Sequence, residues 1–147
     1  GGTIDKYMGD CVMAFWNAPL DDPDHALHAL EAAREMLAAM DQINSDIQAM
    51  LPAGAGVPVI RMGIGINTGT CVVGNMGSDR RFDYSVLGDA VNLASRLEDQ
   101  CKEQAIDILI GQATKNAAPS MAFRKVGDIQ VRGRIATEPT YTLSDQR

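Results

Sequence analysis

Residues 84–98 read YSVLGDAVNLASRLE, and this stretch decides the fold class. The segment FDYSVLG (82–88) has the composition of a strand and ends at Gly88. After it, Leu93 and Leu97 lie four residues apart, which places them on one face of a helix. Asp89 stands where a helix cap is expected. The stretch therefore predicts a strand that leads into a helix over residues 89–104.

The rest of the chain reads as strands and helices in a defined order. We expect a hairpin of residues 2–8 and 11–17 around the turn Gly9-Asp10. Asp22 as N-cap and Pro23 as first helical residue should start a helix that runs to about residue 50. The remaining predicted elements are strands within 60–69, 70–77 and 107–111, a short helix near 112–118, and strands within 123–133 and 139–144. This order favours an α+β fold with helices over a mostly antiparallel sheet.

The first hairpin poses two local questions. Strict alternation would put Ile4, Lys6 and Met8 on one face of the first strand, with Asp5 on the other face. A lysine on an apolar face can guard a sheet edge or belong to a site. From its position alone Asp10 reads first as a turn residue, and its alternative role is as a ligand for a hard metal ion. The second strand, CVMAFWN (11–17), is apolar on both faces, so we expect it to be central in its sheet.

The amino-acid composition limits the kinds of protein that this chain can be. The 147 residues, 46% hydrophobic and 22% charged, suit one domain with a real core. The net charge of -6 argues against binding nucleic acid through nonspecific charge. The three cysteines have neither disulfide nor zinc-site spacing, which suits a reducing, cytoplasmic compartment. The pattern predicts no membrane span and no signal peptide.

Three further motifs each have a structural interpretation. Asn92 and Arg96 share one helix face and could bind a ribose and a phosphate together, although a solvated face has the same pattern. The glycines of GIGINTG (63–69) are not followed by a helix as a nucleotide loop would require, so we expect a bent strand and a close backbone contact. His25 and His28 have no evident metal or catalytic partner and are interpreted as structural.

Together, KYMGD, GINTG, YSVLGDAVNLASRLE and VRGR resemble the class III adenylate/guanylate cyclase catalytic domain in order and approximate spacing. The resemblance covers essentially the whole chain, taken as a single domain over residues 1–147. It implies a ferredoxin-like palm and a head-to-tail homodimer with its active sites between the two copies. It also implies the conversion of ATP to cyclic AMP and pyrophosphate with two Mg²⁺ or Mn²⁺ ions per site.

The resemblance assigns roles to residues of this sequence. Asn92 matches the ribose-positioning asparagine and Arg96 the arginine that stabilises the transition state. Asp10 matches a metal-binding aspartate. The residues that match substrate-binding positions are Lys6 and Ser85 for the purine, and Arg132 and Arg80 for the phosphates. Lysine can only donate, which suits the N1 acceptor of adenine and favours ATP over GTP.

One departure from the family pattern concerns the metal site. The family's other metal aspartate lies on an earlier strand, which this chain lacks together with a helix. We therefore expect an N-terminally truncated domain that is inactive alone, within a parent chain that carries an upstream sensor or membrane region.

Two alternatives remain open. One is a degenerate cyclase-like module that binds nucleotide or forms a dimer without catalysis. The other is a GGDEF-type diguanylate cyclase, which the opening Gly1-Gly2 invites but which the absence of an acidic pair and the presence of the VNLASR helix oppose.

Overall fold

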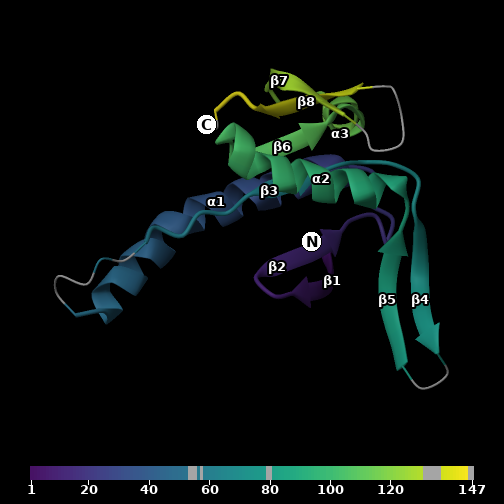
Figure 1. Ribbon diagram of the computed structural model, residues 1–147. Helices are drawn as coiled ribbons and strands as arrows, with labels where there is room; N and C mark the ends of the chain where they lie inside the picture. Colours follow the sequence, from purple (N-terminus) through teal and green to yellow (C-terminus); the bar gives the residue numbers. More distant parts are fainter. Residues whose placement is uncertain (53–55, 57, 79–80, 131–136, 146–147) are drawn as a thin grey trace.

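The computed structural model describes residues 1–52, 56, 58–78, 81–130 and 137–145 (Figure 1). Groups of strands are separated by single helices along the chain, in an α+β arrangement. The elements are β1 (Thr3–Met8), β2 (Cys11–Phe15), α1 (His25–Met50), β3 (Ile64–Ile66), β4 (Val72–Ser78), β5 (Arg81–Leu87), α2 (Asp89–Gln104), β6 (Ile108–Gly111), α3 (Gln112–Ala117), β7 (Phe123–Gln130) and β8 (Thr137–Leu143).

The core lies on both faces of a four-stranded sheet in the order β3-β6-β8-β7. Strands β3 and β6 are parallel, and the other two pairs are antiparallel. Alternation along β6 divides the core: Ile108 and Ile110 pack with Leu30 of α1, whereas Leu109 packs with Leu97 of α2. A strand buried on both faces has to be apolar throughout, and β6 is buried at every residue. The sheet is therefore sandwiched between α1 and α2.

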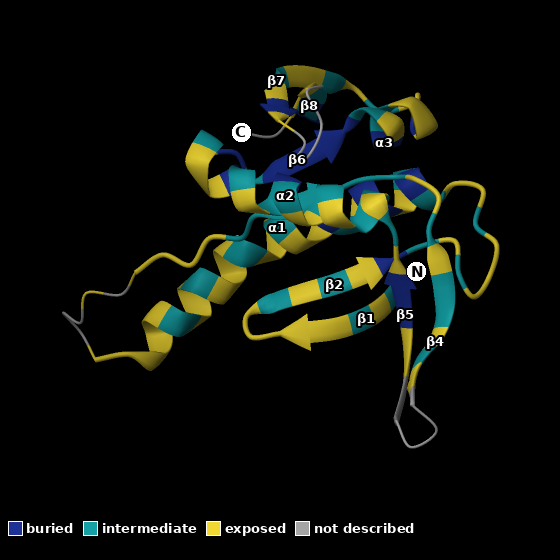
Figure 2. Ribbon diagram, turned by 45° about the vertical axis from the view of Figure 1, so that its right-hand side comes forward, coloured by how far each residue is buried: buried dark blue, intermediate teal, exposed yellow. Residues whose placement is uncertain are grey.

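Helix α1 is buried only in its N-terminal half. Its buried residues are Ala26, Ala29, Leu30 and Ala33, and Met50 at its end is 82% exposed. Figure 2 shows the other half as mostly exposed, away from the sheet. The predicted helix is confirmed, although its apolar stripe is longer than the surface that covers it.

The predicted start of α1 is wrong by two residues. The helix begins at His25 after Asp24, not at Pro23 after Asp22. Asp22 instead accepts a hydrogen bond from the backbone N–H of Asp24 (3.1 Å) and lies 2.8 Å from His28 Nδ1. Its carboxylate thus closes the turn that precedes the helix. Asp89 likewise is the first residue of α2, and Gly88 is its N-cap.

Two antiparallel hairpins, β1-β2 and β4-β5, project from this body (Figures 1 and 2). The prediction that residues 11–17 form a central strand is wrong for the described residues, in which β2 pairs only with β1. Val12 of β2 is consequently 55% exposed. Apolar residues on both faces of a strand indicate that both faces should be buried, but they do not specify which strands lie beside it.

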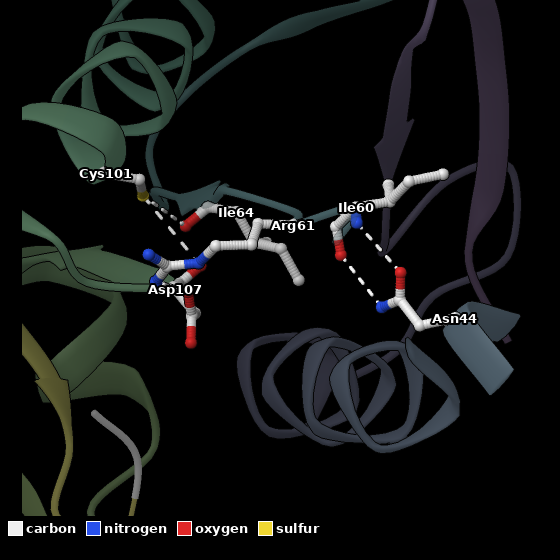
Figure 3. A network of polar contacts seen from close by, with 6 residues as sticks. All are labelled: Asn44, Ile60, Arg61, Ile64, Cys101 and Asp107. Carbon is white, nitrogen blue, oxygen red and sulfur yellow. Dashed lines mark hydrogen bonds and ion pairs between the residues drawn. The ribbon is translucent and has the colours of Figure 1, made fainter. Parts of the chain in front are cut away.

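A polar network fixes the segment that enters β3 (Figure 3). Asn44 of α1 both donates to the Ile60 carbonyl (3.0 Å) and accepts from the Ile60 N–H (2.8 Å). Arg61 forms an ion pair with Asp107 at 2.7 Å. Cys101 of α2 donates to the Ile64 carbonyl, at an Sγ–O distance of 3.5 Å. These contacts tie the segment to α1, to α2 and to the residue that precedes β6.

The glycines of residues 63–69 permit close packing, as predicted. A Cβ at Gly63 would lie 2.9 Å from the Cβ of Cys101, and one at Gly69 would lie 2.7 Å from the Cβ of Ala90. Both contacts are with α2, so this segment sets the height of that helix above the sheet.

The three cysteines are free thiols, and only Cys101 is buried. Within the described residues, no helix is both long and apolar enough to cross a membrane.

Candidate active site

A buried carboxylate links the two side chains that are predicted to bind the purine. Ser85 Oγ on β5 donates to Asp5 Oδ2 on β1 at 2.9 Å, across 80 residues of sequence. The other oxygen of the same carboxylate, Asp5 Oδ1, lies 3.8 Å from Lys6 Nζ. The Asp5 side chain is fully buried, whereas the Lys6 side chain is 47% exposed. Lys6 and Ser85 are thus gathered around one carboxylate.

Asp5 lies at a β-bulge of β1. Ile4 pairs with Ala14 and Lys6 pairs with Met13, so Asp5 is the extra residue between two consecutive pairs. Opposite residues of an antiparallel pair share a face. Lys6 and Ile4 therefore lie on opposite faces, and the predicted grouping of Ile4, Lys6 and Met8 is wrong for Ile4.

The register also orients Lys6. Lys6, Met8 and their partners Met13 and Cys11 share one face, on which Met13 and Cys11 are only partly exposed. The opposite face carries Tyr7, which is 68% exposed. The bulge thus leaves Lys6 on the more covered side, with its ammonium group beside Asp5.

Asp10 lies exposed at the end of the β1–β2 turn, which Gly9 opens with φ 64°. Burial, together with the negative charges of Asp99 and Asp10, raises the pKa of Glu98. The charge of Asp10 therefore acts on Glu98 of α2.

A carboxylate such as that of Asp10 suits Mg²⁺ or Mn²⁺, which prefer oxygen ligands. Within the described residues, however, no group of three or more His, Cys, Asp or Glu side chains could hold a metal ion. Asp10 fits as one ligand of such an ion, and the described residues do not complete the set.

Asn92 and Arg96 project from α2, Asn92 exposed and Arg96 partly exposed. Neither forms a hydrogen bond or ion pair with Lys6, Asp10 or Ser85 among the described residues. This chain by itself therefore gathers Lys6 and Ser85 but does not join them to Asn92 and Arg96. Arg80 and Arg132 lie outside the described residues.

Sequence reasoning did not identify Asp5 as a site residue. Regular alternation of side chains along the strand would place it on the same face as Tyr7, which is exposed. The sequence TIDKYM contains no signal that predicts a bulge. The one available signal was an aspartate directly beside a lysine in a strand of otherwise uncharged residues.

Comparison with known proteins agrees with these motifs. Residues 5–145 match the family described as adenylate and guanylate cyclase catalytic domain. Adenylate cyclase 1 of Rhizobium meliloti is 39% identical over 143 residues, which are 97% of this chain and 21% of that protein. The adenylate cyclase of Anabaena cylindrica is 44% identical over 147 residues, 97% of this chain and 28% of that protein. The chain thus spans under a third of these relatives.

Solved structures extend the comparison to the fold. The adenylyl cyclase CyaB from P. aeruginosa superposes with a TM-score of 0.82 at 34% identity, covering 99% of this chain and 73% of that one. The guanylyl cyclase Cya2 superposes with a TM-score of 0.80 at 33% identity, covering 97% and 69%. The expected palm fold of nucleotide cyclases is confirmed, and the chain belongs to the adenylate and guanylate cyclase catalytic domain family.

Proposed function

We propose that this domain converts ATP to 3′,5′-cyclic AMP and pyrophosphate. The ribose 3′-hydroxyl oxygen forms a bond to the α-phosphorus, the bond from that phosphorus to the pyrophosphate oxygen breaks, and the hydroxyl proton is released. The observation that carries the proposal is the placement of Lys6 and Ser85 around the Asp5 carboxylate.

The choice of ATP rests on these side chains and not on overall similarity. An adenylyl and a guanylyl cyclase are almost equally similar to this chain, at 34% and 33% identity. The Lys6 ammonium donates only, which matches the N1 acceptor of adenine and opposes the protonated N1 of guanine. Ser85 supplies an oxygen that can accept from the adenine amino group.

The roles of the other site residues follow from the positions in the cyclase motifs that they match. We propose that Asn92 orients the ribose and that Arg96 stabilises charge on the transferred phosphorus. Arg80 and Arg132 would bind phosphate oxygens through their guanidinium donors. Asp10 would contribute one carboxylate to Mg²⁺ or Mn²⁺, with the other ligands supplied from elsewhere. Such an ion neutralises phosphate charge when bound.

A second copy of the chain is the proposed partner, arranged head to tail. Both half-sites, Lys6 with Asp10 and Asn92 with Arg96, are present on one chain, with no hydrogen bond or ion pair between the two among the described residues. The two hairpins also expose large apolar side chains, which a partner would cover. These are Ile4 (54%), Tyr7 (68%), Met8 (51%), Val12 (55%), Val72 (69%) and Leu87 (59%).

The alternative function is a nucleotide-binding or dimerisation module without catalysis. The incomplete set of metal ligands among the described residues favours it.

To distinguish the two functions, the full-length protein is incubated separately with ATP and GTP plus Mg²⁺ or Mn²⁺, and cyclic nucleotide is quantified by mass spectrometry. Cyclic AMP from ATP supports the proposal, and nucleotide binding without any cyclic product supports the alternative. Residues 1–147 assayed in parallel should give little or no product.

A further inference from the structure

Asp5 is the most deeply buried carboxylate in the ion pairs of the described residues, and no part of the proposed reaction uses it directly. Its side chain has no exposed surface, and Oδ1 has no hydrogen-bond partner within the part of the chain that the structure describes. Burial of a carboxylate is costly unless its oxygens are satisfied. The position of Asp5 between Lys6 and Ser85 therefore calls for an explanation beyond the folding of a hairpin.

Asp5 determines what the Ser85 hydroxyl can still do. A serine hydroxyl has one proton to donate and two lone pairs with which to accept. Ser85 already donates that proton to Asp5 Oδ2 at 2.9 Å. A group that reaches Ser85 from a ligand must therefore be a donor. Because Ser85 is only 4% exposed, a ligand group that reaches its hydroxyl must be small.

Lys6, which lies beside the same carboxylate, can offer a ligand only hydrogen-bond donors. Its ammonium group has donors only and lies 3.8 Å from Asp5 Oδ1. The two side chains together offer an acceptor and a donor side by side. Adenine presents an amino donor at C6 next to an acceptor at N1, whereas guanine presents an acceptor at C6 next to a protonated N1.

We propose that Asp5 is a positioning residue for nucleotide selection, which holds the Ser85 hydroxyl as an acceptor for the 6-amino group of adenine. This inference rests on the proposed use of ATP and adds the reason why a serine, which could otherwise donate or accept, discriminates at C6. Asp5 itself touches no ligand and acts through Ser85, while its second oxygen keeps the Lys6 ammonium nearby.

The β-bulge supports this role. Bulges re-aim side chains next to functional sites. Here the bulge moves Lys6 from the face of Ile4 to the face of its partner Met13, and so leaves its ammonium group beside the buried Asp5 carboxylate.

The test uses ATP and purine riboside 5′-triphosphate, which lacks the 6-amino group but keeps the N1 acceptor for Lys6. Dissociation constants are measured by competition in the full-length protein. We expect the wild type to bind ATP about 3- to 10-fold more tightly than the analogue, the worth of one hydrogen bond. Asp5→Ala should bring this ratio close to one, and so should Ser85→Ala.

The double variant identifies the route of the effect. If Asp5 acts through Ser85, adding Asp5→Ala to Ser85→Ala should not change the ratio further. Ser85→Thr keeps a hydroxyl and should keep the wild-type ratio. Asp128→Ala removes an equal charge from an exposed ion pair on β7 and should also leave it unchanged.

Several results would overturn the inference. They are a wild-type ratio of one, an unchanged ratio in folded Asp5→Ala, and a ratio that Asp5→Ala still lowers when Ser85 is absent. If Asp5→Ala does not fold, an unchanged ratio in Ser85→Ala is decisive against it. GTP binding more tightly than ATP in the wild type would instead refute the proposed use of ATP, so the two failures are distinguishable.

Discussion

Gly65 of β3 lies directly against Ala94 of α2, so closely that a Cβ at residue 65 would overlap the Ala94 carbonyl oxygen. The same Cβ would also overlap the backbone nitrogen of Glu98 and would lie 3.0 Å from the Cβ of Leu97. Backbone atoms cannot rotate away as side chains do. The helix that carries Asn92 and Arg96 is therefore held at its height above the sheet by the absence of a side chain at residue 65.

Gly65→Ala should destabilise the domain by about 1–3 kcal/mol or more, because helix and strand must separate. Urea unfolding followed by circular dichroism measures the change. Gly74→Ala is the matched control, since a Cβ there meets no atom within 4 Å. Equal unfolding midpoints for Gly65→Ala and the wild type would contradict the packing described for β3 and α2.

Arg96→Ala should lower kcat about 100-fold with a smaller change in KM, if the guanidinium acts mainly on the transition state. Steady-state cyclisation of ATP by the full-length protein measures both constants. Arg34→Ala removes a guanidinium from the exposed pair with Asp145 and serves as the control. A rise in KM alone would reassign Arg96 to ground-state binding.

Lys6→Glu should weaken the use of ATP and permit some use of GTP, because a carboxylate accepts from the protonated N1 of guanine. The ratio of kcat/KM for the two nucleotides is the measurement. The control is Lys125→Glu, which makes the same charge change at an exposed residue of β7. An unchanged ratio would exclude Lys6 from purine selection.

The pair formed by His28 and Asp22 should make stability depend on pH. The hydrogen bond to Asp22 raises the pKa of His28 above 6.5, and the same bond lowers the pKa of Asp22 below 3.8. The His28 contribution is complete below pH 6.5 and is lost as pH rises through the raised pKa. The Asp22 contribution is present above pH 3.8 and is lost as pH falls through the lowered pKa.

NMR titration of the His28 imidazole checks this pair directly. Asp22→Asn should lower the pKa of His28, and Asp24→Asn should lower it less, because Asp24 acts only through charge. Equal effects of the two variants would argue against the hydrogen bond as the main cause.

Cys101 should resist thiol reagents at pH 8. Burial raises the pKa of its thiol to about 11, and the residue is only 3% exposed. Cys11 and Cys71 are partly exposed and should be modified first, although burial raises the pKa of each. Mass spectrometry of the labelled protein gives the order. All three should react in denaturant, and labelling of the folded protein at Cys101 as fast as at Cys71 would disprove its protection.

The position and type of most helices and strands could be predicted from the sequence. The turn at Gly9, the helix over residues 89–104 and the apolar strand within 107–111 could be predicted because each depends on contacts between near neighbours in the chain. The motifs that resemble the cyclase family were also legible, since they are contiguous stretches. The predicted roles of Asp10, Asn92 and Arg96 remain predictions.

Contacts between distant residues, in contrast, could not be predicted without the folded chain. The bulge at Asp5 depends on the register between β1 and β2, and its hydrogen bond to Ser85 joins residues 80 positions apart. The pairing of β2 with β1 alone among the described strands depends on where the other strands lie. The close approach of Gly65 to Ala94 likewise depends on a distant segment. Local propensity sets the conformation of a short stretch, whereas burial and register are fixed by packing against parts of the chain that a local pattern does not contain.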